Sequence, residues 1–328
     1  MSERLSYLDS YRGYMIMWVL VVHISLNYGY IQYGVPSGRY NMFTLLSFYM
    51  FTFYFAAGYF FNNKRDFREL FIRKSRSLVV PWIIYTIFGI LVYLMYCYVV
   101  NEDIKINFYS IINSWALSTN TPMWFLGSLF FSTMATWFMI NWSNRGGVYF
   151  ILMILMLAVL IMIPNRHFPF GVENIILGTL IMNIGYQYKQ FESVLIKRKY
   201  YNLVLLSLFF AIWVLCPCEY WMDRNVVGQG NIFLCLCYGI LGSSVLLMVA
   251  KFIPNDNIVV KSFEYIGKNS LVLFAFHRPV LNYVIEPSLK YFSPGIGYYA
   301  FLSVCLISIM FLYICFLMFA KRYCRILL

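Results

Sequence analysis

The stretch LDSYRGYMIMWVLVVHIS, residues 8–25, has the composition of a membrane helix but carries two basic side chains. From Tyr14 onward it is almost continuously apolar, and a helix that crosses a bilayer core needs about 20 such residues. Arg12 stands near its start and His23 lies inside it. An ionisable group within a membrane span is costly, so its presence indicates a function.

The composition of the whole chain agrees with that stretch. Of its 328 residues, 62% are hydrophobic and 12% are charged, and the mean hydropathy is +0.70. A soluble domain has about 25% charged residues. The sequence therefore predicts an all-α, polytopic membrane protein, a single domain over residues 1–328 with no separate soluble part. Its ten spans are expected at residues 8–30, 42–61, 78–100, 122–140, 147–163, 170–188, 201–216, 230–250, 268–286 and 297–320.

The basic residues behind the net charge of +12 are distributed as the expected topology requires. With both termini in the cytoplasm, eighteen of the 25 Lys and Arg residues fall on the cytoplasmic side and five fall outside. This bias is the positive-inside pattern of membrane proteins. It explains most of the basic charge without a nucleic-acid partner.

The cysteines do not indicate a metal centre. The pairs in CPC (216–218) and CLC (235–237) lack the usual zinc spacing, and no cluster of His or carboxylates accompanies them. We expect apolar packing for these cysteines and no metal.

Arg12 and His23 are expected on one face of the first helix. Eleven residues correspond to about 1100° of rotation and about 16–17 Å of rise, so the two side chains point within about 20° of each other. Asp9 or Ser10 is expected to cap the helix start. An Arg at the cytoplasmic mouth and an imidazole at depth suit an anionic ligand that enters from the cytoplasm. The alternatives are an Arg12 that reaches lipid phosphates and a His23 that bonds a neighbouring helix.

A second histidine is expected at a similar depth. His277 lies nine residues after Lys268, the expected cytoplasmic start of its span, which is about 13–14 Å. Arg278 follows it, and Pro279 removes a backbone donor and kinks the helix. The alternative is a structural kink beside a hydrogen-bonded His. The third histidine, His167 in the loop PNRHFPF, is expected to be incidental.

The basic segment RKSR, residues 73–76, precedes the third span. Arg73, Lys74 and Arg76 either set the topology or bind phosphates, since Arg side chains grip phosphate oxygens in pairs. Both interpretations stay open on the sequence.

Together these residues resemble the acyltransferase-3 family of bacterial membrane O-acyltransferases. Arg12 followed by His23 resembles the opening pattern of that family. Further blocks follow in the family's order, namely FYFAAGYFF (53–61), IRKSRSLVVPW (72–82), PMWFLGSLFF (122–131) and IGKNSLVLFAFHRPV (266–280). One departure is Ala57, which stands where the family's second block has a small polar residue before the glycine.

The resemblance implies transfer of an acyl group, usually acetyl from acetyl-CoA, to a hydroxyl of a cell-envelope or extracellular sugar. Acetyl-CoA is then a substrate, and no permanently bound cofactor is expected. Arg12, Arg73, Lys74, Arg76, Lys268 and Arg278 would bind the donor. His23 would act as general base or as a transient acyl carrier. Trp124, His277 or Arg278 would donate hydrogen bonds to the thioester oxyanion.

Two other functions are compatible with the sequence. A transporter of glycan or lipid-linked glycan also carries polar residues at mid-membrane, although internal repeats are not evident. A catalytically inactive partner in an envelope-synthesis complex is the third. The acceptor sugar and self-association into a homo-oligomer are left open.

Overall fold

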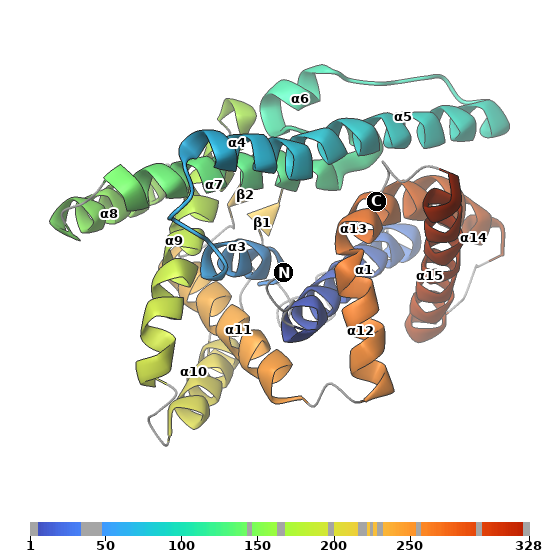
Figure 1. The fold of residues 1–328 in the computed structure, drawn as a ribbon. Helices are drawn as coiled ribbons and strands as arrows, with labels where there is room; N and C mark the ends of the chain where they lie inside the picture. The colour runs from blue at the N-terminus through green and yellow to red at the C-terminus, as the bar shows by residue number, and fades with distance from the viewer. Residues whose placement is uncertain are drawn as a thin grey trace.

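The computed structural model describes residues 6–33, 48–142, 146–162, 168–195, 200–215, 222–223, 226–227, 232–253, 257–292 and 297–323. This part of the chain is mostly helical, with short connecting segments and one pair of very short strands (Figure 1). The helices are α1 (Ser6–Tyr33), α3 (Tyr49–Tyr59), α4 (Phe67–Lys74), η1 (Ser75–Val79), α5 (Val80–Val100), α6 (Tyr109–Ser114), η2 (Ser118–Met123), α7 (Trp124–Trp142), α8 (Gly146–Met162), η3 (Pro169–Gly171), α9 (Val172–Leu195), α10 (Tyr201–Leu215), α11 (Ile232–Phe252), α12 (Ile258–Lys268), α13 (Ser270–Val280), η4 (Leu281–Ile285), α14 (Glu286–Phe292) and α15 (Tyr298–Tyr323).

Each predicted span overlaps at least one of these helices, and residues 42–47 of the second span lie outside the described residues. Within the described residues, three helical stretches have both the length and the hydropathy to cross a bilayer: Phe67–Val100, Tyr109–Asn141 and Tyr298–Arg322. Gly147–Met162, Tyr201–Ile212 and Leu236–Phe252 are shorter apolar helices. The chain therefore has the helical membrane character that its composition predicts. The number of ten spans and the side of each terminus stay predictions.

The structure corrects several local expectations. Much of the segment between the expected spans 42–61 and 78–100 is helical, because α4, η1 and α5 form one long rod (Figure 1). The segment between the expected spans 78–100 and 122–140 contains α6 and the start of η2. Strands β1 (Met222–Asp223) and β2 (Val226–Val227) pair antiparallel, a small exception to the all-α prediction. Helix α1 already begins at Ser6, so Asp9 and Ser10 lie inside it and do not cap it.

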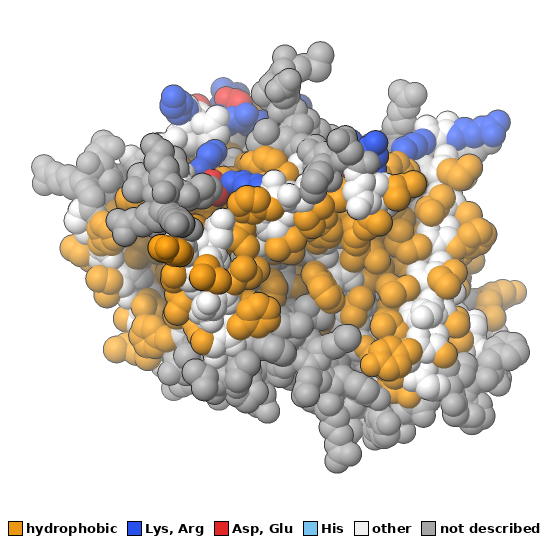
Figure 2. Space-filling view, turned by 90° about the horizontal axis from the view of Figure 1, so that it is seen from below, with side chains coloured by type: hydrophobic (Ala, Val, Ile, Leu, Met, Phe, Trp, Pro, Cys, Tyr) orange, Lys and Arg blue, Asp and Glu red, His pale blue; other side chains and the backbone are white. Residues whose placement is uncertain are grey.

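The outer surface is rich in apolar side chains. Helices α5 and α15 expose Met95 (69%), Ile307 (69%) and Phe311 (65%). Figure 2 shows a face on which hydrophobic side chains dominate, while the visible Lys and Arg gather along one edge. A surface of this kind is solvated by lipid, because water would penalise so much contiguous apolar area.

Helix α1 lies in the interior of the bundle, against α12, α13 and α15 (Figure 1). Its crossing with α12 is close because glycines face backbone on both sides. A Cβ at Gly267 would come within 1.7 Å of the Asp9 carbonyl oxygen, and one at Gly13 within 2.0 Å of the Phe263 oxygen. Glycine pairs of this kind let membrane helices approach each other's backbone. The crossing sets the position of the face that carries His23.

Candidate active site

Two histidines that are far apart in the sequence meet inside the bundle. The ring of His23 on α1 lies 5.1 Å from the ring of His277 on α13, measured between centroids, with the planes inclined by 31°. His277 is fully buried, and Nδ1 of His23 is buried as well. The structure thus brings together the two histidines that the sequence places at similar depth.

The hydrogen bond of His277 defines its tautomer. Nδ1 lies 3.2 Å from the carbonyl oxygen of Leu273, one turn earlier on α13. A carbonyl oxygen only accepts, so Nδ1 of the neutral ring carries the hydrogen and Nε2 carries a lone pair. Within the described residues, neither His277 Nε2 nor His23 Nδ1 has a hydrogen-bond partner. Buried polar atoms of this kind are rare in folded proteins and often belong to a functional site.

Arg278 is held beside the histidines through Asn27. Its Nη1 donates to Oδ1 of Asn27 at 2.8 Å, and Nδ2 of Asn27 donates to Glu286 Oε2 at 2.9 Å. The same Nδ2 lies 3.2 Å from Oδ1 of Asn282. Asn27 is one turn after His23 on α1, so the network joins α1 to α13, η4 and α14. We refer to His23, Asn27, His277, Arg278 and Glu286 as the histidine cluster.

Arg12 lies at the other end of the same helix, as expected. Its guanidinium is 3.8 Å from the buried carboxylate of Asp9, and its side chain is 44% exposed. The half-buried Lys74 of α4 experiences electrostatic repulsion from Arg12 and from Arg65. The positive charges of Arg12, Arg65 and Lys74 are therefore close enough to repel each other, which favours the binding of an anion between them.

The other predicted donor-binding cations lie on exposed surface. Arg73 and Arg76 are exposed on α4 and η1. Lys268 is 42% exposed at the end of α12, where its Nζ lies 2.6 Å from Glu264 Oε1. Their role in donor binding stays a prediction.

Trp124 begins α7 and is connected to His277 only through other rings. It packs edge-on against Phe125, with 6.0 Å between centroids. Phe125 contacts Phe274 at 5.5 Å, and Phe274 lies 6.0 Å from His277. These contacts connect Trp124 to His277 through two phenylalanine rings. Its predicted role as an oxyanion donor stays a prediction.

Three polar residues near the histidines were not anticipated from the sequence. Asn27 could have been recognised, because it follows His23 by four residues and so shares its helical face. Glu286 was harder to recognise as a site residue, because it lies at the predicted end of its span. No sequence pattern pointed to Asn120, since it lies in an irregular turn between α6 and α7. Its contacts depend on the packing of α5 against α13.

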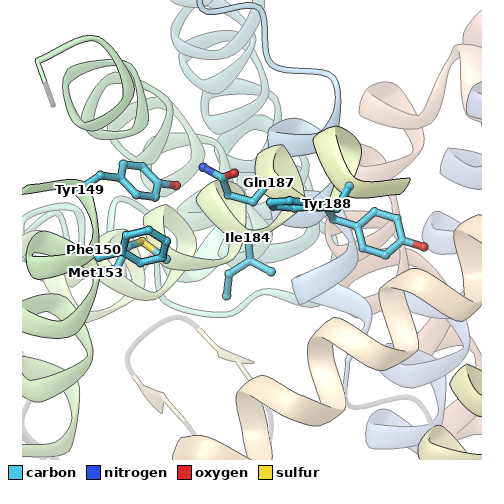
Figure 3. A pocket seen from close by; sticks show the side chains of 7 residues that line it. Tyr149, Phe150, Met153, Ile184, Gln187 and Tyr188 are labelled. Carbon is cyan, nitrogen blue, oxygen red and sulfur yellow. The ribbon is translucent and has the colours of Figure 1, made fainter. Parts of the chain in front are cut away.

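A groove of about 530 Å³ lies elsewhere, between α8 and α9 (Figure 3). Tyr149, Phe150 and Met153 line one side, and Ile184 and Gln187 line the other. Among the described residues, no group of three His, Cys, Asp or Glu side chains is suited to a metal ion. Cys216, Cys218 and His167 lie outside the described residues.

Comparison with known proteins agrees with the resemblance of the motifs. The model of the acyltransferase-3 family, which is described as an acyltransferase domain, matches residues 5–320. Neither the curated proteins nor the solved structures contain a match. The matched range includes α1 with Arg12 and His23 as well as α13 with His277, and it covers nearly the whole chain. The chain is therefore a member of the acyltransferase-3 family of membrane acyltransferases.

Proposed function

We propose that this protein is an O-acetyltransferase. It would move an acetyl group from cytoplasmic acetyl-CoA to a hydroxyl of a cell-envelope or extracellular polysaccharide sugar. The family supports acyl transfer in general, while the donor, the acceptor and the residue roles are part of the proposal. The observation that carries it is the meeting of His23 and His277 in the interior, on the helix that presents Arg12 at its other end.

The donor would bind along α1. Coenzyme A is a multiply phosphorylated anion with a long, thin pantetheine arm. The cations Arg12, Lys74 and Arg65 offer phosphate ligands at one end of the helix. Eleven residues separate Arg12 from His23, a rise of about 16 Å, and an extended pantetheine arm covers that scale of distance. Arg73, Arg76, Lys268 and Arg278 remain further candidates for contacts with the donor.

The transfer itself needs a base and a site for the oxyanion. His23 would take the proton of the acceptor hydroxyl while the oxygen attacks the thioester carbonyl. When the carbon–sulfur bond breaks, the thiolate leaves and the imidazolium returns the proton to it. The Arg278 guanidinium, held by Asn27, suits the stabilisation of the oxyanion. The Nε2 lone pair of His277 makes it an acceptor in the neutral tautomer, so it would act as an oxyanion donor only when protonated.

A covalent route uses the same residues. His23 would attack the thioester and carry the acetyl group as an acyl-imidazole, which the acceptor hydroxyl then cleaves. Rapid mixing with radiolabelled acetyl-CoA in the absence of acceptor distinguishes the two routes. Label on His23 together with a burst of free CoA supports the covalent route. If the wild type releases CoA only after acceptor is added, and no label stays on His23, general-base catalysis is supported.

The proposal is tested with purified protein in detergent or vesicles of bacterial inner-membrane lipid. We expect binding of radiolabelled acetyl-CoA that Lys74→Glu weakens about tenfold, because one attractive phosphate contact becomes repulsive. Lys105→Glu is the matched control, since it changes the charge equally at an exposed position of the predicted outer loop. An equal loss of acetyl-CoA binding in both variants would contradict a donor site at α1 and α4.

A transporter of glycan or lipid-linked glycan is the second candidate, because polar groups in the membrane interior also suit a permease. The same vesicles distinguish the two. Acetyl groups that appear on the glycan only with acetyl-CoA and wild-type protein support the enzyme. Glycan that crosses the vesicle membrane without acetylation supports the transporter.

A further inference from the structure

The backbone of α13 loses a hydrogen bond beside His277. Pro279 lies inside this helix, and proline has no N–H. In a regular helix the N–H of residue 279 would donate to the carbonyl oxygen of residue 275. The Ala275 oxygen is therefore deprived of its helical donor, two residues before His277. A buried carbonyl without a donor costs about 1–3 kcal/mol, so the fold must provide for it.

Asn120 provides that donor from another part of the chain. Its Nδ2 donates to the Ala275 oxygen at 3.1 Å and also to the Tyr85 oxygen of α5 at 3.0 Å. Asn120 is 1% exposed. One side-chain amide thus replaces the missing backbone donor and ties α13 to α5.

The local structure is shaped for this contact. Asn120 interrupts η2 with a non-helical backbone, φ −149° and ψ 73°, which turns its side chain toward α5 and α13. Gly89 leaves the space on α5, because a Cβ there would come within 2.6 Å of the Asn120 Cβ. The adjoining Pro122 and Trp124 lead directly into α7.

We propose that Asn120 is a positioning residue for His277, acting through the carbonyl that Pro279 leaves without a donor. It holds the segment Ala275–Pro279 so that the ring of His277 lies beside that of His23 and the Arg278 guanidinium reaches Asn27. The catalytic part of this inference rests on the acyl transfer proposed above. The structural part rests only on the contacts of Asn120.

A double-mutant cycle tests the inference. The four proteins are the wild type, Asn120→Ala, Pro279→Ala and the double variant. The Pro279→Ala substitution restores the backbone N–H, which then donates to the Ala275 oxygen and makes Asn120 redundant there. The effect of Asn120→Ala is compared between the two backgrounds, so that any effect of Pro279→Ala itself cancels.

Two measurements are made on each of the four proteins. The first is steady-state acetyl transfer. In the wild-type background we expect Asn120→Ala to lower kcat about ten- to hundredfold through misplacement of His277, with KM for acetyl-CoA changed less than about twofold. In the Pro279→Ala background we expect a loss below about threefold, because the restored N–H holds the segment.

The second measurement needs no turnover. Diethyl pyrocarbonate labels accessible histidines, and mass spectrometry of the digested protein gives the rate at His277. This ring is fully buried in the structure, so labelling is expected to be slow in the wild type. It should rise several-fold in Asn120→Ala and return toward the wild-type rate in the double variant.

Asn183→Ala is the matched control. Asn183 is also fully buried, and its Nδ2 also donates to a carbonyl oxygen, that of Thr179 on α9, at 2.8 Å. This variant should lower the unfolding temperature without changing kcat or the labelling of His277. The proposal is overturned if Asn120→Ala changes His277 labelling equally in both backgrounds, or if it leaves kcat and labelling unchanged. A wild type that transfers no acyl group contradicts the acetyltransferase proposal, while the labelling cycle still decides the role of Asn120.

Discussion

Two polar clusters of this bundle differ in how completely their members are paired. In the Glu192 cluster (Tyr59, Glu192 and Lys251), the carboxylate of α9 forms an ion pair with Lys251 of α11 and accepts a hydrogen bond from Tyr59 of α3. Lys251 Nζ also lies 2.9 Å from the Tyr59 hydroxyl. In the histidine cluster, by contrast, one ring nitrogen of each histidine has no hydrogen-bond partner within the described residues.

The difference indicates separate roles. Opposite charges that pair with each other connect helices and leave few polar atoms available to bind a ligand. A nitrogen lone pair without a partner is available to a proton or a carbonyl carbon, and the fold bears a desolvation cost to keep it there. The Glu192 cluster is thus expected to hold α3, α9 and α11 together, and the histidine cluster to do chemistry.

The largest effect is expected from His23→Ala. Loss of the base or acyl carrier should lower kcat/KM for acetyl transfer by about 10²–10⁴-fold. The unfolding temperature should change little, because His23 Nδ1 makes no hydrogen bond that folding would lose. Transfer is measured with radiolabelled acetyl-CoA and glycan acceptor, and glycan acetyl content is measured in cells. Normal acetylation at normal protein levels would contradict the role of His23.

Glu192→Ala should have the opposite profile. It leaves the Lys251 ammonium, whose side chain is 23% exposed, without its carboxylate. We expect about 2–3 kcal/mol of destabilisation, less than for a fully buried pair. Unfolding of the purified protein followed by tryptophan fluorescence gives this value. Activity per folded molecule should stay within about twofold of the wild type if the cluster is only structural. A selective loss of kcat would assign the Glu192 cluster to the active site.

Asn27→Ala tests the link between Arg278 and Glu286. It removes the acceptor of the Arg278 guanidinium and the donor to Glu286. We expect kcat to fall about tenfold, because a charged side chain that is no longer oriented stabilises an oxyanion less well. Asn282→Ala is a milder control, since its contact with Asn27 at 3.2 Å does not involve Arg278. Equal losses in the two variants would argue against orientation of Arg278 by Asn27.

Tyr59→Phe should have the smallest effect. It removes one hydroxyl from the Glu192 cluster and leaves the ion pair in place, so about 1 kcal/mol of stability is expected to be lost. The unfolding experiment used for Glu192→Ala measures it, and acetyl transfer should not change. A loss as large as that of Glu192→Ala would mean that the hydroxyl, and not the charge pair, holds the helices together.

Much of the candidate site could be inferred from the sequence because its members share helices. Arg12 and His23 lie on one continuous helix, so helical geometry alone relates their positions. The depth of His277 followed from its distance to Lys268. The helix over much of residues 62–77 could not be inferred, because the six Lys and Arg residues of this stretch favoured a loop between two spans. In the structure Asp66 caps α4 by accepting a hydrogen bond from the Arg68 N–H.

The sequence by itself was sufficient to predict a helical membrane protein and to recognise the acyltransferase motifs. Both predictions depend on apolar runs and residue spacings that can be seen within a single segment. Only the tertiary structure decided which polar groups meet. The contact of His23 with His277, the bridge from Arg278 through Asn27 to Glu286, and the bond from Asn120 to Ala275 all join segments far apart in the chain. Such contacts depend on close helix crossings, above all that of Gly13 with α12, which no single segment specifies.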